Sequence, residues 1–171
     1  VGIGTLGRLW CSLYIAGYKS NSLITTGPYS ISRNPLYFFS FVGAIGVGLA
    51  SETLLITFII LAVFSLYYPY VIKAEENKLA KLYGDKFAEY VNSVPSFFPN
   101  VSLFSEPSEY LVNPIIFRKH IFDALWFIWM LGIMEIIEGL HEANILPVLL
   151  TIYWCPFKEA VLCLTEVSLF V

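Results

Sequence analysis

Residues 36–72 read LYFFSFVGAIGVGLASETLLITFIILAVFSLYYPYVI, two apolar runs with a short polar break at Ser51-Glu52. The second run supplies about 20 apolar residues, enough to cross roughly 30 Å of hydrocarbon as a helix. The first run reaches a comparable length only when residues 33–35 extend it. The pattern predicts a hairpin of two antiparallel membrane-spanning helices over residues 36–72.

Composition supports a membrane location. Of the 171 residues, 57% are hydrophobic and 13% are charged, with a mean hydropathy of +0.71. Soluble domains carry about 25% charged residues, so this composition favours a membrane protein over a soluble helical bundle. The net charge of −3 argues against nucleic acid as a partner, because no basic stripe neutralises phosphates. The three cysteines form no CxxC pair, which argues against a metal site or a disulfide framework.

Two further apolar runs, residues 121–140 and 145–164, predict additional spans, and Pro147 and Pro156 interrupt the second. We therefore expect an all-α, polytopic, multi-pass membrane protein with about four visible spans. The chain begins at Val1 rather than Met, so we also expect an N-terminal part to precede it.

Charge is distributed asymmetrically around these runs. All ten Lys and Arg residues, Arg8 among them, lie outside the two short connections at 51–52 and 141–144. The positive-inside rule therefore predicts that the basic segments are cytoplasmic. This orientation puts residues 26–37 and the Glu75-Glu76 pair on the cytoplasmic side.

The segment between the second and third runs has its own periodicity. Residues 74–94 place apolar side chains three and four positions apart, with charged residues opposite them. This spacing predicts an amphipathic helix at the membrane interface. Gly84 weakens that helix and permits a local break, and Val94-Pro95 ends it. Residues 105–114 read as a polar linker.

The hairpin is preceded by the turn segment Thr26-Gly27-Pro28-Tyr29-Ser30-Ile31-Ser32-Arg33-Asn34-Pro35-Leu36-Tyr37. Its prolines and glycine set turns. Two adjacent carboxylates, Glu75 and Glu76, return to the same membrane face, and carboxylates near lipid are costly and often mark function. These features predict a small-molecule site at one membrane face.

Plainer roles compete with that prediction. Arg33 suits an interfacial cation that snorkels toward water, and Tyr29 and Tyr37 suit an aromatic belt. For Glu76 we favour a solvated position in the first turn of the interfacial helix. Glu135 and its neighbour at 138 share one face of the third run, where they suit a substrate path.

The spacing of these motifs resembles the integral-membrane methyltransferases typified by isoprenylcysteine carboxyl methyltransferase and the phospholipid N-methyltransferases. The family pattern runs Leu-Val-x-x-Gly-Pro-Tyr-x-x-x-Arg-His-Pro-x-Tyr, then Glu-Glu-x-x-Leu, Phe-Gly, Tyr-x-x-Tyr and Val-Pro. The matching parts of this chain, within residues 8–99, are Leu23-Ile24, Gly27-Pro28-Tyr29, Arg33-Asn34-Pro35-Leu36-Tyr37, Glu75-Glu76 with Leu79, Tyr83-Gly84, Phe87 with Tyr90, and Val94-Pro95.

The resemblance implies an enzyme that transfers a methyl group from S-adenosylmethionine to a lipophilic or lipid-modified acceptor in the membrane. It implies a core over residues 1–104, with hairpin 36–72 and interfacial helix 74–94, and a linker with a C-terminal membrane extension over 105–171. The cofactor contacts that it implies are Asn21, Ser22, Leu23, Ile24, Tyr29, Asn34, Pro35, Leu36, Tyr37 and Glu75. An earlier contact falls near Tyr14. No catalytic residue and no metal ligand are assigned.

Two positions depart from the family pattern. Asn34 replaces the usual histidine, and an asparagine can form hydrogen bonds but cannot titrate near neutrality. Val71 stands where the prenylcysteine enzymes carry an arginine implicated in recognising the substrate carboxylate. A carboxylate without a cationic partner is costly to desolvate, so we expect a neutral or amine-bearing lipid acceptor.

Two other functions are compatible with the sequence. A non-catalytic membrane interaction subunit that retains the fold suits Asn34 and the small-residue face Ala44-x-x-x-Gly48, which favours close helix packing. A transporter would use Glu135 and Glu138 as intramembrane ion ligands, although the internal repeats typical of transporters are not detectable.

Overall fold

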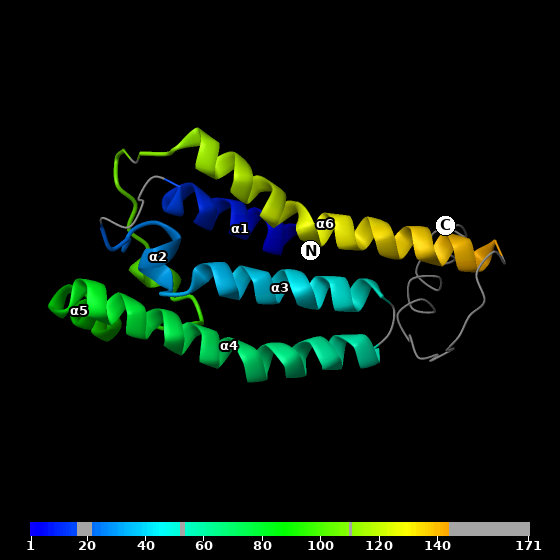
Figure 1. The fold of residues 1–171 in the computed structure, drawn as a ribbon, viewed down its shortest axis with the longest axis horizontal. Coiled ribbons are helices and arrows are strands. Elements are labelled where there is room, and N and C mark those ends of the chain that lie inside the picture. The colour runs from blue at the N-terminus through cyan, green and yellow to red at the C-terminus, as the bar shows by residue number, and fades with distance from the viewer. Residues whose placement is uncertain (17–21, 52–53, 110, 144–171) are drawn as a thin grey trace, which may run out of the picture.

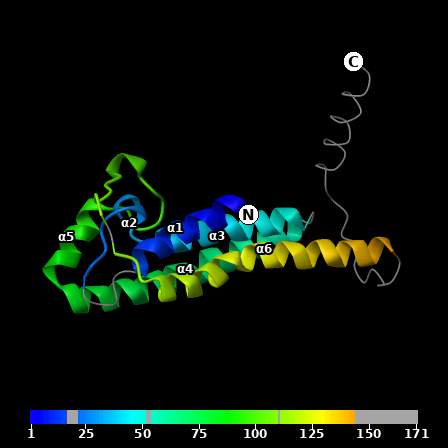
Figure 2. The same cartoon turned by 90° about the horizontal axis from the view of Figure 1, so that it is seen from above.

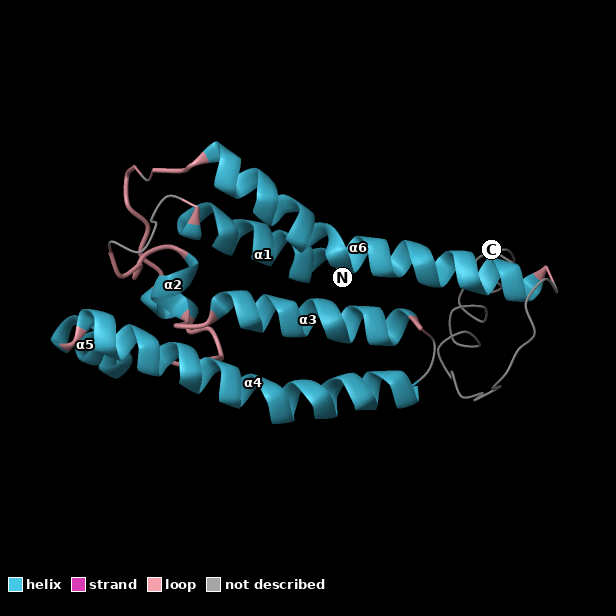
Figure 3. Ribbon diagram, in the orientation of Figure 1, coloured by secondary structure: helices cyan, strands magenta, loops and turns pink. Residues whose placement is uncertain are grey.

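The computed structural model describes residues 1–16, 22–51, 54–109 and 111–143, and every regular element within these ranges is helical (Figure 3). The elements are α1 (Gly2–Ile15), α2 (Pro28–Ile31), α3 (Pro35–Ala50), α4 (Leu54–Tyr83), α5 (Asp85–Ser93), the 3-10 helix η1 (Val101–Leu103) and α6 (Pro114–Glu142). The predicted all-α class is confirmed for these ranges.

The helices α6, α1, α3 and α4 lie side by side in that order (Figure 1). α1 packs against both α3 and α6, and α3 packs against α4. The sequence did not predict α1, because the glycines at 2, 4 and 7 lower helix propensity over a short stretch. Its tertiary contacts outweigh that penalty, since packing supplies most helical stability in proteins.

Glycines allow the neighbouring helices to approach one another closely. A Cβ at Gly4 of α1 would overlap the backbone of Gly43 in α3. On the other side of α3, a Cβ at Gly48 would lie 3.0 Å from the Cα of Thr57 in α4. Small-residue contacts of this kind are typical of helices that pack within membranes. The small-residue face predicted on α3 is therefore used within the chain.

In the described ranges, α4 and α6 are long and apolar enough to cross a membrane. Only 11% of the most apolar window of each helix is buried, unlike the covered core helices of a soluble protein. α3 is apolar but has 16 residues, fewer than the roughly 20 that a span needs. Four spans are thus not confirmed. The third predicted span lies within α6, and the fourth, residues 145–164, lies outside the described residues.

The boundary after the hairpin differs from the prediction. α4 continues through Ile72 to Tyr83, so the predicted start of a separate interfacial helix at residue 74 is wrong. The stretch from Lys73 to Tyr83 contains no glycine or proline, so nothing in it ends a helix. The break falls at Gly84, where the sequence permitted one, with a φ of 52° that glycine adopts without steric cost. α5 then ends at Ser93, as predicted.

The connecting segments gather at one end of the bundle. α2, α5 and the segments that lead into α3 and α6 lie there, while the last turn of α3 lies at the opposite end (Figure 1 and Figure 2). Backbone hydrogen bonds join segments far apart in the sequence: Gly27 N–H donates to Ser105 O at 2.7 Å, and Arg33 N–H donates to Pro95 O at 2.9 Å. Residues 95–105 are thereby held against the turn segment.

Candidate functional site

Gly27 begins the site by setting a turn. Its φ is 61°, and as the N-cap of α2 it places Pro28 in the first helical turn, where a missing N–H is tolerated. The ring of Tyr14 lies so close that a Cβ at Gly27 would overlap it. The Tyr14 hydroxyl donates to Glu106 Oε1 at 2.8 Å. Tyr14 therefore links α1 to the turn and to the segment that precedes α6.

Tyr29, Tyr37 and Glu75 come together at this end of the bundle. The Tyr37 hydroxyl donates a hydrogen bond to Glu75 Oε2 at 2.9 Å. Burial raises the pKa of Tyr29 well above its usual value, and the nearby charges of Glu75 and Tyr37 add to the shift. Tyr90 donates to the Tyr29 carbonyl at 2.6 Å and so anchors the backbone of α2. We call Tyr29, Tyr37 and Glu75 the tyrosine–glutamate cluster.

The other residues that the resemblance implies for the cofactor are more dispersed. Residues 22–24 lie on the irregular segment before the turn, with Ser22 exposed and the next two half-buried. Pro35 is fully buried and Leu36 is half-buried, both in the first turn of α3. Asn21 lies outside the described residues.

Glu76 does not occupy the solvated position that the sequence predicted. Its Oε1 accepts hydrogen bonds from Asn34 Nδ2 at 3.3 Å and from Ser96 Oγ at 3.2 Å. Arg33 Nε lies 3.2 Å from the same oxygen. The prediction is wrong because α4 begins far earlier, at Leu54. Glu76 therefore lies well inside a helix, half-buried against the turn segment.

Arg33 and Asn34 fasten the turn before α3 to α5 and to the segment that follows it. Arg33 Nη1 donates to Val91 O at 3.0 Å, and Asn34 Nδ2 donates to Ser96 O at 3.0 Å. Asn34 is only 7% exposed, so its side-chain amide bonds to protein groups rather than to solvent. The position of Arg33 is that of a brace between three segments, rather than a cation that reaches toward water.

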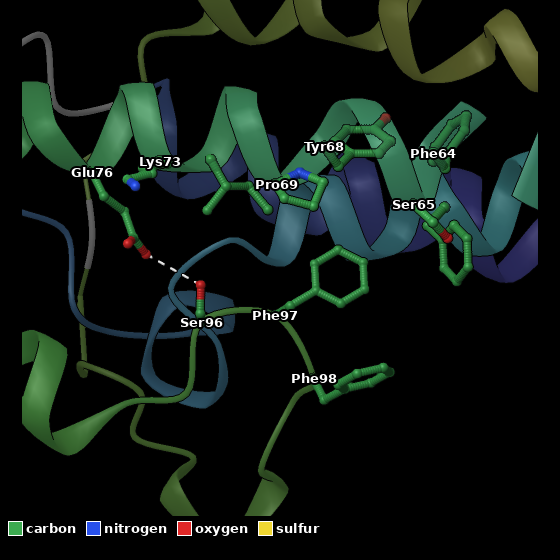
Figure 4. A pocket seen from close by; sticks show the side chains of 11 residues that line it. Phe64, Ser65, Tyr68, Pro69, Lys73, Glu76, Ser96, Phe97 and Phe98 are labelled. Carbon is green, nitrogen blue, oxygen red and sulfur yellow. Dashed lines mark hydrogen bonds between the residues drawn. The ribbon is translucent and has the colours of Figure 1, made fainter. Parts of the chain in front are cut away.

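An apolar groove of about 670 Å³ lies beside Glu76 (Figure 4). Aromatic side chains from α3, α4 and the segment after α5 line it, and charged and hydroxyl groups form its polar end. The lining residues include Phe41, Tyr68, Phe97, Lys73, Glu76 and Ser96. Sequence reasoning missed the groove because three separate segments build it. The available signal was Phe97-Phe98, an aromatic pair between two prolines.

One pair of rings connects the groove with the tyrosine–glutamate cluster. The rings of Tyr37 and Tyr68 meet edge to face with centroids 5.2 Å apart, a favourable aromatic geometry. Tyr37 belongs to the cluster and Tyr68 to the groove wall. The two candidate binding regions are therefore neighbours with a shared aromatic wall.

Arg8 lies inside the bundle, which the sequence did not reveal. Its Nη1 donates to Ser40 Oγ of α3, and its guanidinium carbon lies 5.7 Å from the ring centre of Phe127 in α6. Ser40 Oγ in turn donates to the Leu36 carbonyl at 2.7 Å. The prediction grouped Arg8 with the cations outside the spans. Because α1 packs against both α3 and α6, Arg8 carries no information about orientation.

Within the part of the chain that the structure describes, no three His, Cys, Asp or Glu side chains gather as a metal site. The arrangement offers instead a carboxylate with two tyrosines, beside an apolar groove with a polar end. Such a pair of regions suits one polar and one lipophilic ligand.

The fold and the site define a helical membrane protein with a polar cluster at one end of its bundle. A sequence profile described as phospholipid methyltransferase matches residues 7–86, which run from α1 into α5. The chain therefore belongs to the phospholipid methyltransferase family, and the predicted resemblance to membrane methyltransferases is confirmed.

Two curated relatives are similar over most of the chain. The cobalt-zinc-cadmium resistance protein CzcN of Cupriavidus metallidurans is 40% identical over 152 residues, 89% of this chain and 70% of the relative. The nickel-cobalt-cadmium resistance protein NccN of Alcaligenes xylosoxydans xylosoxydans is 42% identical over 147 residues, 86% of this chain and 68% of the relative. No solved structure matches the chain significantly.

Proposed function

We propose that this protein transfers a methyl group from S-adenosylmethionine to a lipophilic acceptor at the cytoplasmic face of a membrane. The observation that supports this most directly is the Tyr37–Tyr68 pair, with ring centroids 5.2 Å apart, between the tyrosine–glutamate cluster and the apolar groove. A water-soluble cofactor at the cluster and a lipophilic acceptor in the groove would meet each other beside these two rings. Membership in the methyltransferase family supports the same chemistry.

The tyrosine–glutamate cluster fits the cofactor by its chemistry. Glu75 is exposed, and Tyr37 bonds to only one of its carboxylate oxygens, so the other can accept hydrogen bonds from hydroxyl or ammonium groups. Tyr29 and Tyr37 offer aromatic surface for the adenosyl part. The bound cofactor supplies an electrophilic methyl group. The protein supplies alignment, which accounts for much of the rate in such reactions.

Some residues around the cluster would hold it in position, and others would add further contacts to the cofactor. Arg33 and Asn34 brace the turn, since their side chains bond to Val91, Ser96 and Glu76. Asn34 would thus act on the cofactor through the backbone of the turn. The proposed contacts that remain are Asn21, Ser22, Leu23, Ile24, Pro35 and Leu36.

The groove fits a lipophilic acceptor. Its aromatic wall suits a hydrocarbon chain, and its polar end presents Lys73 and Glu76 together. A cation beside an anion suits a neutral or amine-bearing head group better than a lone carboxylate, because the carboxylate of Glu76 repels another one. No side chain is assigned as a general base. A nucleophilic acceptor such as an amine requires none.

We further propose the orientation and the division of the chain. The turn segment, Glu75 and α5 face the cytoplasm, with the amphipathic α5 near the membrane interface. Residues 1–104 form the methyltransferase core, and residues 105–171 form an extension. The helix α6 of that extension packs against α1 and α3, so it contributes to the walls of the bundle.

The orientation predicts the outcome of cysteine labelling in intact cells. A cysteine introduced at Ser51 should react with a membrane-impermeant reagent from outside, and one at Lys78 should react only after the membrane is permeabilised. The reason is that the 51–52 connection carries no Lys or Arg, whereas Lys78 lies with the cations of the cytoplasmic side. Ser108→Cys serves as a second cytoplasmic position. External labelling of Lys78→Cys would reverse the orientation and place the cluster outside.

The groove predicts the class of acceptor. Val71 offers no cation, and Lys73 shares the polar end of the groove with the Glu76 carboxylate, so we expect no useful methylation of a free-carboxylate prenylcysteine. An aminolipid should be methylated more efficiently. Incorporation of label from radioactive S-adenosylmethionine into the two acceptors, in parallel reactions, measures the difference. Robust turnover of the prenylcysteine would contradict the acceptor class while supporting methyl transfer.

The proposed function itself is tested by direct calorimetric binding of S-adenosylmethionine to the detergent-solubilised full chain. Saturable binding with one site per chain supports it.

A second candidate is a membrane interaction subunit without catalysis, which two observations favour: Asn34 replaces the family histidine, and the relatives carry names of metal resistance proteins. Absence of cofactor binding by folded protein would favour this second function.

A further inference from the structure

Residues 97–104, which contain η1, run along the sides of the helices rather than across their ends. The ring of Phe97 lies 5.8 Å from that of Phe38 and 5.9 Å from that of Phe41, between centroids. α3 begins at Pro35, so at 1.5 Å per residue Phe97 lies about 5–9 Å along the apolar helix from its start. We call residues 97–104 the dipping segment.

The other end of the dipping segment descends beside α1. The ring centroids of Phe104 and Trp10 are 6.0 Å apart, and Trp10 lies well inside α1 (Gly2–Ile15). An apolar hollow of about 610 Å³ opens there, lined in part by Trp10, Val101 and Phe104. The groove at Phe97 lies at the other end of the segment. The dipping segment is thus flanked by two apolar hollows, both against helices of the bundle.

The exposed surface of the dipping segment carries no charge and is mainly apolar, and the two exposed polar residues, Asn100 and Ser102, bond to each other. The side chains of Phe98 and Val101 are 74% and 77% exposed. No Asp, Glu, Lys or Arg occurs between Glu89 and Glu106. Large uncharged apolar patches of this kind mark surfaces that contact another apolar phase. Because the helices of the bundle also expose many large apolar side chains, lipid is the partner that suits both.

Many backbone polar groups of this irregular stretch form hydrogen bonds within the protein, which suits an apolar environment. Asn100 N–H donates to Ile31 O at 2.8 Å, and the N–H groups of Leu103 and Phe104 donate to the carbonyls of Asn100 and Val101. The Phe97 carbonyl accepts from Ser32 Oγ at 3.0 Å. Irregular backbone is tolerated at membrane depth only where its polar groups are bonded within the protein. These bonds satisfy that condition for much of the segment.

We propose that the dipping segment inserts among the acyl chains of the leaflet nearest the site, with lipid chains filling the two hollows beside it. The sequence predicted a membrane-interface role for residues 74–94. The exposed apolar side chains of residues 97–104 make this second segment better suited to contact lipid. The inserted segment forms one wall of the groove, so it holds the polar end of the groove at the level of lipid head groups. This proposal does not depend on methyl transfer.

Depth-dependent fluorescence quenching tests the proposal. The full chain, with its three native cysteines replaced by alanine, receives one cysteine labelled with an environment-sensitive dye. It is then reconstituted into phosphatidylcholine vesicles that contain nitroxide-labelled acyl chains. Val101→Cys is compared with Leu66→Cys, on the exposed side of α4 at 70% exposure, and with Lys86→Cys on α5. Quenching at Val101 should approach that at Leu66 and exceed that at Lys86 by about threefold, since an inserted side chain lies among the acyl chains.

Phe98→Cys provides a second position in case the first variant folds poorly, and it should be quenched as strongly as Val101→Cys. Quenching at both positions equal to that at Lys86 would overturn the proposal, because the segment would then lie in water. A blue-shifted emission without quenching by the lipid nitroxides would also overturn it. That result would mean that protein, rather than lipid, covers the segment.

Discussion

Replacing Gly27 with alanine should lower the stability of the protein by several kcal/mol. The φ of 61° at this position strains any residue with a side chain, at a cost of about 1–3 kcal/mol. The added Cβ would also overlap the ring of Tyr14, and overpacking a fitted site costs about 1–3 kcal/mol more. Thermal unfolding in detergent, followed with a thiol-reactive dye that reports exposure of the buried Cys11, measures the change.

Two glycines act as matched controls for this variant. Gly84 has a φ of 52°, but a Cβ there meets no atom within 4 Å, so Gly84→Ala carries the strain without the overlap. Gly132 lies inside α6 and is also unobstructed, so Gly132→Ala should be neutral or stabilise by about 0.5–1 kcal/mol. Unfolding temperatures should therefore rank Gly132→Ala highest and Gly27→Ala lowest. Equal values for Gly27→Ala and Gly84→Ala would show that the Tyr14 contact does not constrain the turn.

Replacing Glu75 with glutamine should weaken the affinity for S-adenosylmethionine about 10- to 100-fold, since losing a charge-assisted hydrogen bond costs about 1.5–3 kcal/mol. Glu75 is the exposed carboxylate of the tyrosine–glutamate cluster. The substitution keeps the size of the side chain and its ability to accept from Tyr37. Calorimetric titration of the wild-type and variant proteins gives the two dissociation constants.

Glu76→Gln is the matched control, because it removes the same charge one residue away. Its carboxylate bonds to Arg33, Asn34 and Ser96, so the variant should lose stability and retain most of its cofactor affinity. Thermal unfolding separates the two effects. Equal losses of affinity in Glu75→Gln and Glu76→Gln, with both variants folded, would defeat the assignment of Glu75 to the cofactor.

Most of the helical architecture was predictable from the apolar runs. They located α3, α4 and α6 because an uninterrupted apolar stretch has few alternatives to a helix. The hairpin then required residues near the start of α3 to meet residues near the end of α4, as Tyr37 and Glu75 do. The extent of α4 was not predicted. The change from apolar to amphipathic composition at Lys73 predicts a boundary there, but α4 continues as far as Gly84, where the sequence does permit a break.

The different environments of Glu75 and Glu76 could not be predicted from the sequence. Adjacent residues on a helix point about 100° apart, so the rotation of α4 decides which of them meets the turn segment and which stays exposed. That rotation results from the packing of α3 and α4, which the pattern of Glu75-Glu76 does not contain. For the same reason the groove beside Glu76 was not predicted, since its wall needs Phe97 from a distant segment.

The sequence alone determined that this protein has membrane-length helices, a hairpin and turns that hold its motifs at one end, because composition and local propensity act within each segment. Only the tertiary structure decided that Arg8 lies inside the bundle, that Glu76 is paired with Arg33, and that residues 97–104 descend beside α3. These facts depend on which faces of separate helices meet. Packing between segments distant in the sequence sets that choice.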